Sequence, residues 1–117
     1  MSGPEKRSKL ALHVCCGPCA TAVIERLANE YDVTAVWYNP NIAPAQEHDL
    51  RRGAMRTVAE RCGVELVELE YDPSAWEAVC AGLKDKPEGG ARCVECFRLR
   101  LERVARWAAA RGVDTLA

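Results

Sequence analysis

This 117-residue chain has no long hydrophobic run. Its apolar stretches are far shorter than the roughly 18 consecutive apolar residues of a membrane-spanning helix. The basic residues Lys6, Arg7 and Lys9 precede only a short apolar run, which contains His13 and a cysteine pair and is unlike a signal peptide. We therefore expect a cytoplasmic protein that makes no contact with a membrane.

The chain also lacks a strong net charge, internal repeats and low-complexity segments. A formal net charge of −1 argues against a protein that attracts nucleic acid over its whole surface. Positive charge is concentrated locally, because six arginines and only two glutamates lie between positions 92 and 111. This arginine-rich segment predicts either contacts with phosphate groups or an ordinary solvated helix face.

A content of 49% hydrophobic and 28% charged residues is typical of a globular protein, and the length predicts one domain. We assign this domain to residues 10–117 and expect residues 1–9 to form a flexible N-terminus. The predicted strands are 10–14, 33–38, 64–69 and 113–117, and the predicted helices are 18–27, 46–62, 73–80 and 93–111. Residues 84–91 form a predicted loop. In the last helix, one apolar stripe is predicted from Phe97, Leu101, Val104 and Ala108.

The alternation of strands and helices predicts an α/β fold, a three-layer parallel sheet with helices on both faces. Ligands of such sheets bind beyond the carboxyl ends of the strands, near helix N-termini. Cys15 and Cys16 directly follow the first predicted strand, and Asn39 follows the second. Cys93 and Cys96 open the last helix. The topology therefore predicts that the two cysteine groups meet at this edge.

Seven cysteines without an export signal point to reduced thiols used in metal binding or redox chemistry. Cys93 and Cys96 lie three residues apart, on one side of the first turn of a helix. The helix dipole and Arg92 favour thiolates there, and thiolates at this spacing bind iron–sulfur clusters or zinc. Arg100 lies on the same face and would offset the negative charge of a thiolate-ligated cluster. A pair of small core residues is the alternative interpretation.

The tetrad Cys16-Gly-Pro-Cys19 permits two further interpretations. A strand before it and a helix after it are typical of a thioredoxin-like redox centre, which needs only Cys16 and Cys19. A structural zinc site in a nucleic-acid-binding module would instead use Cys16, Cys19, Cys93 and Cys96. The additional Cys15 argues against the first, and the long separation of the two pairs argues against the second. Neighbouring residues on an extended backbone point to opposite sides, so Cys15 and Cys16 are expected to serve different centres.

Three other residues of metal-binding types are expected to be structural. Cys62 and Cys80 lie within apolar patterns, which predicts that both thiols pack in the core. His13 lies within the first predicted strand, where a hydrogen-bonded histidine is more common than a metal ligand.

Four motifs follow one another along the chain. They are His13-Val-Cys-Cys-Gly-Pro-Cys19; Tyr38-Asn-Pro-Asn-Ile42 with Pro44; Tyr71-Asp72 with Trp76; and Glu88-Gly-Gly-Ala-Arg-Cys-Val-Glu-Cys96, followed by Arg98 and Arg100-Leu101. In this order and spacing they resemble the QueH family, the cobalamin-independent epoxyqueuosine reductases, from about Leu10 to Thr115. Any one motif is weak, whereas the four together are highly specific.

The resemblance implies an adenine-nucleotide-alpha-hydrolase-like (HUP-type) fold. ATP-dependent activity is not expected, because the cysteine pair replaces the phosphate-binding loop of ATP-using relatives. The resemblance implies a [4Fe–4S] cluster bound by Cys16, Cys93 and Cys96, beside a mononuclear iron bound by Cys15. Cys19 either binds that iron or packs. Cys15 and Cys16 are then the expected catalytic residues.

The implied reaction is the reduction of the epoxide of epoxyqueuosine in tRNA to queuosine, the last step of queuosine biosynthesis. The implied partners are that tRNA and a low-potential electron donor such as ferredoxin or flavodoxin. The residues expected to contact tRNA or substrate are Tyr38, Asn39, Asn41, Arg92, Arg98, Arg100 and Arg103.

The chain departs from the family pattern in two places. Glu47-His48 stands where the family often has an acidic and then an aromatic residue. Family members also continue past position 117 with a further strand and a threonine-rich segment that helps to close the active site. We therefore expect a C-terminally truncated member of the family.

Overall fold

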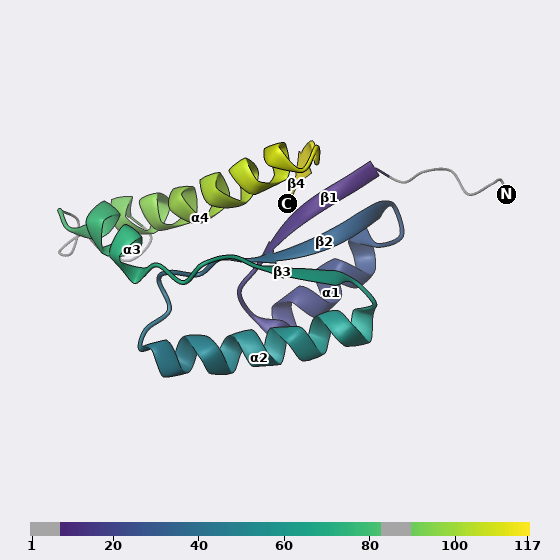
Figure 1. Ribbon diagram of the computed structural model, residues 1–117, viewed down its shortest axis with the longest axis horizontal. Coiled ribbons are helices and arrows are strands. Elements are labelled where there is room, and N and C mark those ends of the chain that lie inside the picture. Colours follow the sequence, from purple (N-terminus) through teal and green to yellow (C-terminus); the bar gives the residue numbers. More distant parts are fainter. Residues whose placement is uncertain (1–7, 83–89) are drawn as a thin grey trace, which may run out of the picture.

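The computed structural model describes residues 8–82 and 90–117, without the side chain of Arg92, and is built on a four-stranded parallel sheet (Figure 1). The strands are β1 (Ser8–Val14), β2 (Tyr31–Trp37), β3 (Glu65–Glu68) and β4 (Thr115–Leu116), in the order β3-β2-β1-β4. β1 and β2 are paired along their full length, with Val14 opposite Trp37, so both strands end at the same edge. The predicted parallel sheet is confirmed.

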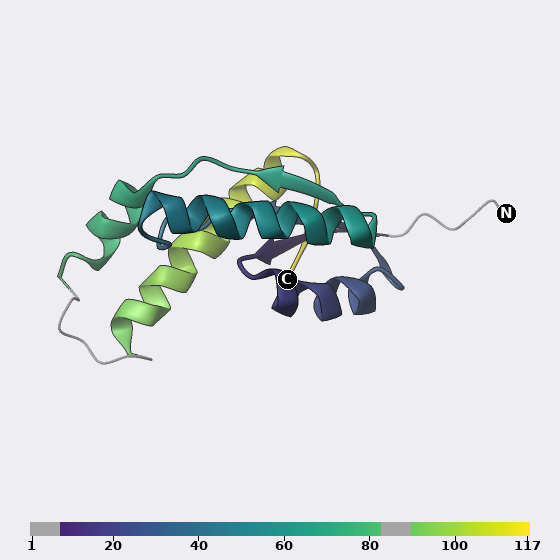
Figure 2. The ribbon, with the colours of Figure 1, turned by 90° about the horizontal axis from the view of Figure 1, so that it is seen from below.

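Helices cover both faces of this sheet. α1 (Gly17–Leu27) and α2 (Ala45–Cys62) lie on one face and α4 (Ala91–Ala110) lies on the other (Figure 1 and Figure 2). The short α3 (Pro73–Cys80) packs against α4. The predicted three-layer α/β arrangement is confirmed, and its HUP-type assignment stays a prediction. None of the described helices is both long and apolar enough to cross a membrane.

The period-2 alternation of the strands creates two hydrophobic cores. The core under α1 and α2 contains Leu10, Leu12, Val14, Val33, Ala35, Trp37, Ile24 and Met55. The core under α4 contains Ala11, Val36, Val104, Ala108 and Val113. Cys62 packs against the first core and Cys80 is buried, which confirms the prediction for these two thiols.

Some element boundaries differ from the prediction. β1 begins at Ser8, so the last two residues of the expected flexible N-terminus belong to the sheet, and residues 1–7 lie outside the described residues. α4 begins at Ala91, because Gly90 takes the N-cap position. Positions 84–89 of the predicted loop also lie outside the described residues. The last predicted strand is reduced to Thr115–Leu116.

The predicted apolar stripe of the last helix is wrong in its first half. Val104 and Ala108 are buried, but Phe97 and Leu101 are 56% and 42% exposed. Figure 1 shows that the N-terminal half of α4 extends past the carboxyl ends of the strands, so this half of the helix has no sheet beneath it. One turn before Val104, the buried position is occupied by Arg100.

Two ion pairs hold the C-terminal end of β3 and the residues after it to the helices on both faces. Arg56 of α2 donates two hydrogen bonds to Glu68, at 2.7 and 2.6 Å. Arg103 of α4 donates two to Glu70, at 2.7 and 2.9 Å. These hydrogen bonds lower the pKa of Glu68 and of Glu70 below the ordinary value of 4.5.

We expect Glu70→Gln to make the protein less sensitive to acid. The ion pair stabilises the fold above the unfolded-chain pKa of 4.5, and this stabilisation is lost as the pH falls through the lower pKa of the folded state. Because the Glu70 side chain is 50% exposed, solvent screens the pair and the effect is about 1 kcal/mol or less. Urea unfolding at neutral and acidic pH measures it, with Glu60→Gln at an exposed site of α2 as the control. An unchanged acid dependence in Glu70→Gln would contradict this account.

Candidate metal centre at the carboxyl edge of the sheet

Three cysteines lie where β1 passes into α1. Cys16 is the N-cap residue of α1, with φ −147° and ψ 125°, and Cys19 lies in the first turn of the helix. Pro18 is accommodated there because first-turn N–H groups have no helical acceptor. Cys15 and Cys19 are exposed and Cys16 is half-buried. All three line an open depression of about 130 Å³ between the end of β1 and α1.

Cys16 and Cys19 differ in acidity. The backbone N–H and the thiol of Cys19 interact with the Cys16 sulfur and lower the pKa of Cys16, and the charge of Arg51 adds to the effect. The pKa of Cys19 is raised, because its thiol interacts with Cys16 and a second thiolate is disfavoured. Of Cys16 and Cys19, Cys16 therefore forms a thiolate more readily.

Two side chains tie the carboxyl ends of β1 and β2 together. Asn39 is fully buried, and its Nδ2 donates a 2.9 Å hydrogen bond to the carbonyl oxygen of Val14, the residue before Cys15. His13 Nε2 donates to the carbonyl oxygen of Tyr38 at 3.0 Å. Burial lowers the pKa of His13, so the neutral ring carries its proton on the donating Nε2. The prediction of a structural, hydrogen-bonded His13 is confirmed.

The second cysteine group lies at the start of α4. Cys93 and Cys96 are half-buried in the first two turns of this helix. α4 runs opposite to the strands, so its N-terminus lies at the same end of the sheet as Cys15 and Cys16 (Figure 1 and Figure 2). Both cysteine groups therefore lie toward the carboxyl ends of the strands, as the topology predicts.

The two cysteine groups do not form a single metal site in the described part of the chain. Within residues 8–82 and 90–117, no three cysteine, histidine, aspartate or glutamate side chains are arranged to hold a metal ion. The structure brings Cys15, Cys16 and Cys19 together in one turn, and Cys93 and Cys96 together in another. A common ligand set drawn from both turns stays a prediction.

Arg100 is only 7% exposed, although it carries a full positive charge. Its guanidinium carbon lies 4.6 Å from the centroid of the Phe97 ring, and its Nε donates to the carbonyl oxygen of Cys96 at 3.4 Å. None of the ion pairs in the described part of the chain includes Arg100. Its charge is therefore available to balance negative charge on nearby thiolates.

The other arginines expected at tRNA differ in availability. Arg98 is 60% exposed and lies 3.8 Å from Glu95, a loose surface pair. Arg103 is already engaged by Glu70. The side chain of Arg92 lies outside the described residues. Arg98 is therefore the most accessible of the described arginines named for this role.

The three polar residues expected at the substrate are mostly internal. Tyr38 and Asn39 are 3% and 0% exposed, and the Asn39 side chain is bonded to the carbonyl oxygen of Val14. Asn41 is half-buried, and its buried Oδ1 has no hydrogen-bond partner among the described residues. Their contact with substrate stays a prediction.

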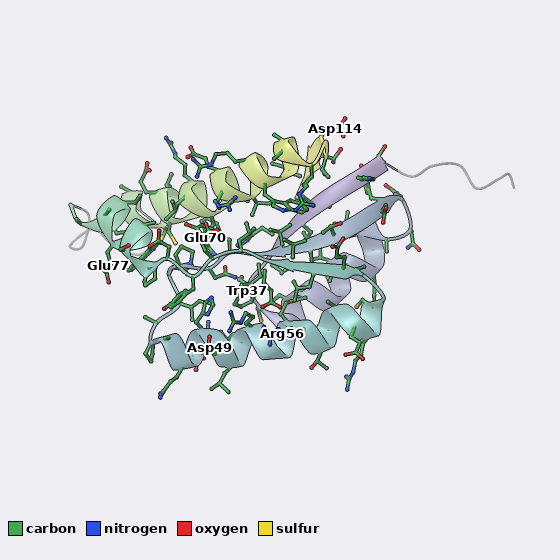
Figure 3. All side chains as sticks on the ribbon, viewed as in Figure 1. Trp37, Asp49, Arg56, Glu70, Glu77 and Asp114 are labelled. Atoms are coloured by element: carbon green, nitrogen blue, oxygen red, sulfur yellow. The ribbon has the colours of Figure 1, made fainter. Side chains whose placement is uncertain are left out.

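Sequence reasoning missed a buried cluster around His48 of α2. Trp37 Nε1 donates to His48 Nε2 at 2.9 Å, and the His48 ring is stacked on Tyr71 with 3.9 Å between ring centroids. The Tyr71 hydroxyl donates to the carbonyl oxygen of Ile42 at 2.6 Å. Trp37 lies between the sheet and α2 (Figure 3). Because Nε2 accepts, neutral His48 carries its proton on Nδ1, facing Asp49 at 3.4 Å.

The family model described as epoxyqueuosine reductase QueH matches residues 10–117. This chain belongs to the QueH family. The epoxyqueuosine reductase QueH of Histophilus somni is 38% identical over 110 residues, which cover 93% of this chain and 45% of the relative. That of Haemophilus influenzae is 36% identical over 110 residues, with 93% and 45% covered. That of Thermotoga maritima is 34% identical over 107 residues, with 89% and 54% covered. The chain spans about half the length of these curated relatives.

The donor set of this QueH family member suits a thiolate-bound metal group. Cys15, Cys16, Cys19, Cys93 and Cys96 are free thiols, not disulfides, and they lie where α1 and α4 begin. The lowered pKa of Cys16 favours a thiolate at that residue, and the buried charge of Arg100 would balance negative charge at the start of α4.

We expect Asn39→Ala to lower the free energy of unfolding by about 1–3 kcal/mol, because the buried carbonyl of Val14 loses its hydrogen-bond donor. Urea unfolding measures the change. Asn29→Ala, at an exposed turn after α1, is the control and is expected to have little effect. Equal stability of the two variants would show that Asn39 does not hold the strand ends together.

Proposed function

We propose that this QueH family member reduces the epoxide of epoxyqueuosine in tRNA to the alkene of queuosine. The observation that carries the proposal is the family match over residues 10–117, which includes all five cysteines of the carboxyl side. The relatives named above for this activity support it. An enzyme of tRNA modification would act in the cytoplasm.

Cys16, Cys93 and Cys96 are the proposed ligands of a [4Fe–4S] cluster, and Cys15 is the proposed ligand of a neighbouring iron. Cys19 is either a further ligand of that iron or a packing residue. When bound, such a group supplies single electrons and, at an iron left open by three-cysteine ligation, a Lewis acid for the epoxide oxygen.

The chain's own residues prepare this chemistry. The turn that begins α1 lowers the pKa of the proposed ligand Cys16. The buried Arg100 guanidinium lowers the electrostatic cost of gathering several negative charges. Asn39 and His13 fix the strand ends that carry the Cys15–Cys16 turn.

Conversion of an epoxide to an alkene and water consumes two electrons and two protons. We propose a low-potential carrier such as ferredoxin or flavodoxin as the source of the electrons. The tRNA would be bound in part by phosphate contacts from the arginine-rich helix α4, with Arg98 as the most exposed described candidate. Arg92 and Arg100 are further proposed contacts, and Arg103 would have to leave Glu70 to join them.

One other function has support from a specific contact. The interaction that lowers the pKa of Cys16 through Cys19 is also what a thioredoxin-like dithiol oxidoreductase needs. Such a protein would reduce disulfides of another protein and bind no iron. A zinc-bearing nucleic-acid-binding module would hold zinc and have no redox activity.

Anaerobic reconstitution with iron and sulfide tests these proposals. We expect a brown protein that, given dithionite and tRNA carrying epoxyqueuosine, forms queuosine detected by mass spectrometry of the nucleosides. Cys16→Ser, Cys93→Ser and Cys96→Ser are each expected to lose the cluster absorption and the product. Cys62→Ser, which changes a thiol at the far end of α2, is the matched control and is expected to keep both. A colourless chain with stoichiometric zinc, or disulfide reductase activity without iron, would contradict the proposal.

We expect Arg98→Ala to weaken tRNA binding and to reduce the slope of log affinity against log salt concentration by about one, because one phosphate contact is lost. Fluorescence anisotropy at several salt concentrations measures this. Arg26→Ala, in the last turn of α1, is the matched control and is expected to leave the slope unchanged. Equal slopes for both variants would exclude a phosphate contact by Arg98.

A further inference from the structure

The proposed ligand set leaves one conspicuous feature without a fixed role. Cys16-Gly-Pro-Cys19 and Cys93-Val-Glu-Cys96 have the same spacing, but only the first pair has a thiol, at Cys19, outside the cluster ligands. The two pairs also occupy different positions in their helices. The position of each pair in its helix determines whether its two thiols can form a disulfide.

Cys16 is the N-cap residue of α1, with an extended backbone, and Cys19 lies three residues further on, in the first turn. The carbonyl oxygen of Cys16 already accepts the hydrogen bond from Ala20 N at 2.9 Å, which closes this turn. The side chain of an N-cap residue points across the helix start, toward the third residue of the helix. Cys16 and Cys19 both line the same open depression.

Cys93 and Cys96 lie inside a continuous helix, because α4 begins at Ala91 and its N-cap is Gly90. Side chains three apart within a helix are neighbours on one face, with Cβ atoms about 5–6 Å apart. A disulfide needs Cβ atoms about 3.5–4.5 Å apart, so joining these thiols would strain the helix. The extended N-cap backbone of Cys16 removes this obstacle for the first pair.

The remaining thiols are poor partners for Cys16. Cys15 is its neighbour on an extended backbone, where side chains point to opposite sides. Cys62 lies at the C-terminal end of α2 and Cys80 is buried in α3. Cys19 is exposed, so a small disulfide can reach it from solvent.

We propose that Cys16 and Cys19 form a reversible intramolecular disulfide that removes Cys16 from metal binding, whereas Cys93 and Cys96 stay reduced. The oxidant is a low-molecular-weight disulfide such as oxidised glutathione. One thiol of the pair attacks it, forms a mixed disulfide and releases one glutathione. The second thiol attacks the mixed disulfide, closes the Cys16–Cys19 bond and releases the second glutathione, so two thiols are oxidised and one disulfide is reduced. The proposed disulfide does not depend on the activity of the chain, whereas its effect on metal loading rests on the proposed function.

The disulfide is tested in the metal-free chain, equilibrated anaerobically with mixtures of reduced and oxidised glutathione, alkylated and digested with trypsin. Peptide Leu10–Arg26 contains Cys15, Cys16 and Cys19, and peptide Cys93–Arg98 contains the other pair, so each is measured separately in one sample. We expect the first peptide to lose two hydrogens and to keep one alkylated cysteine. The second peptide is expected to become oxidised only when the ratio of oxidised to reduced glutathione is on the order of tenfold higher, because a strained disulfide has a higher reduction potential. Oxidation of both peptides at the same mixture would overturn the proposal.

Two variants identify the bond. Cys15→Ser is expected to keep the intramolecular disulfide, and Cys19→Ser is expected to lose it and to accumulate glutathione bound to Cys16. Both changes are at exposed positions, and far-ultraviolet circular dichroism checks that both variants fold. Loss of the disulfide in Cys15→Ser, or its persistence in Cys19→Ser, would assign the bond to another pair and overturn the proposal.

Iron loading tests the consequence. The pre-oxidised chain is expected to take up no cluster until dithiothreitol opens the disulfide, after which loading matches that of the reduced chain. Equal loading of the oxidised and reduced chains would overturn the link between the disulfide and metal binding. If the reduced chain takes up no iron either, the proposed function fails together with this link, while the disulfide found by mass spectrometry is unaffected.

Discussion

The hydrogen bond from Asn39 to the carbonyl of Val14 holds together the strand ends on which the candidate site depends. It joins the last residue of β1 to the residues after β2, directly before the Cys15–Cys16 turn, and His13 makes a second such link to Tyr38. With both links in place, the direction of the chain leaving β1 is fixed. The cysteine turn then opens α1, and Cys16 becomes its N-cap residue. The acidity of Cys16 follows from that position.

Most of the architecture follows from local sequence signals. Apolar and β-branched runs identified all four strands, and Pro18, Gly63 and Gly112 marked helix ends correctly; the two glycines adopt φ values of 70° and 72°, which suit glycine. The placement of both cysteine groups toward the carboxyl ends of the strands could also be predicted. In a parallel sheet all strands end at the same edge, and the helices that follow them begin near that edge.

The sequence pattern alone could not predict how far α4 reaches beyond the sheet. The pattern of Phe97, Leu101 and Val104 predicts a single buried stripe. Burial depends on what lies under each turn, however, and the N-terminal half of α4 extends past the sheet, with Phe97 and Leu101 exposed. The burial of Arg100 and the stacking of His48 were also missed, because the burial of a polar side chain depends on partners that the hydrophobic pattern does not reveal. Arg100 packs on the Phe97 ring, and His48 is held by Trp37 and Tyr71. The distance between the two cysteine turns is likewise a tertiary property that motif spacing does not determine.

The central claim is that thiols from α1 and α4 bind one metallocluster at the carboxyl edge of the sheet. An anaerobic crystal structure of the iron-loaded chain tests it most directly. The account predicts that the sulfurs of Cys16, Cys93 and Cys96 bind the same cluster, with the Arg100 guanidinium close by. Separate metal ions in the two turns, or iron bound by only one of them, would contradict it.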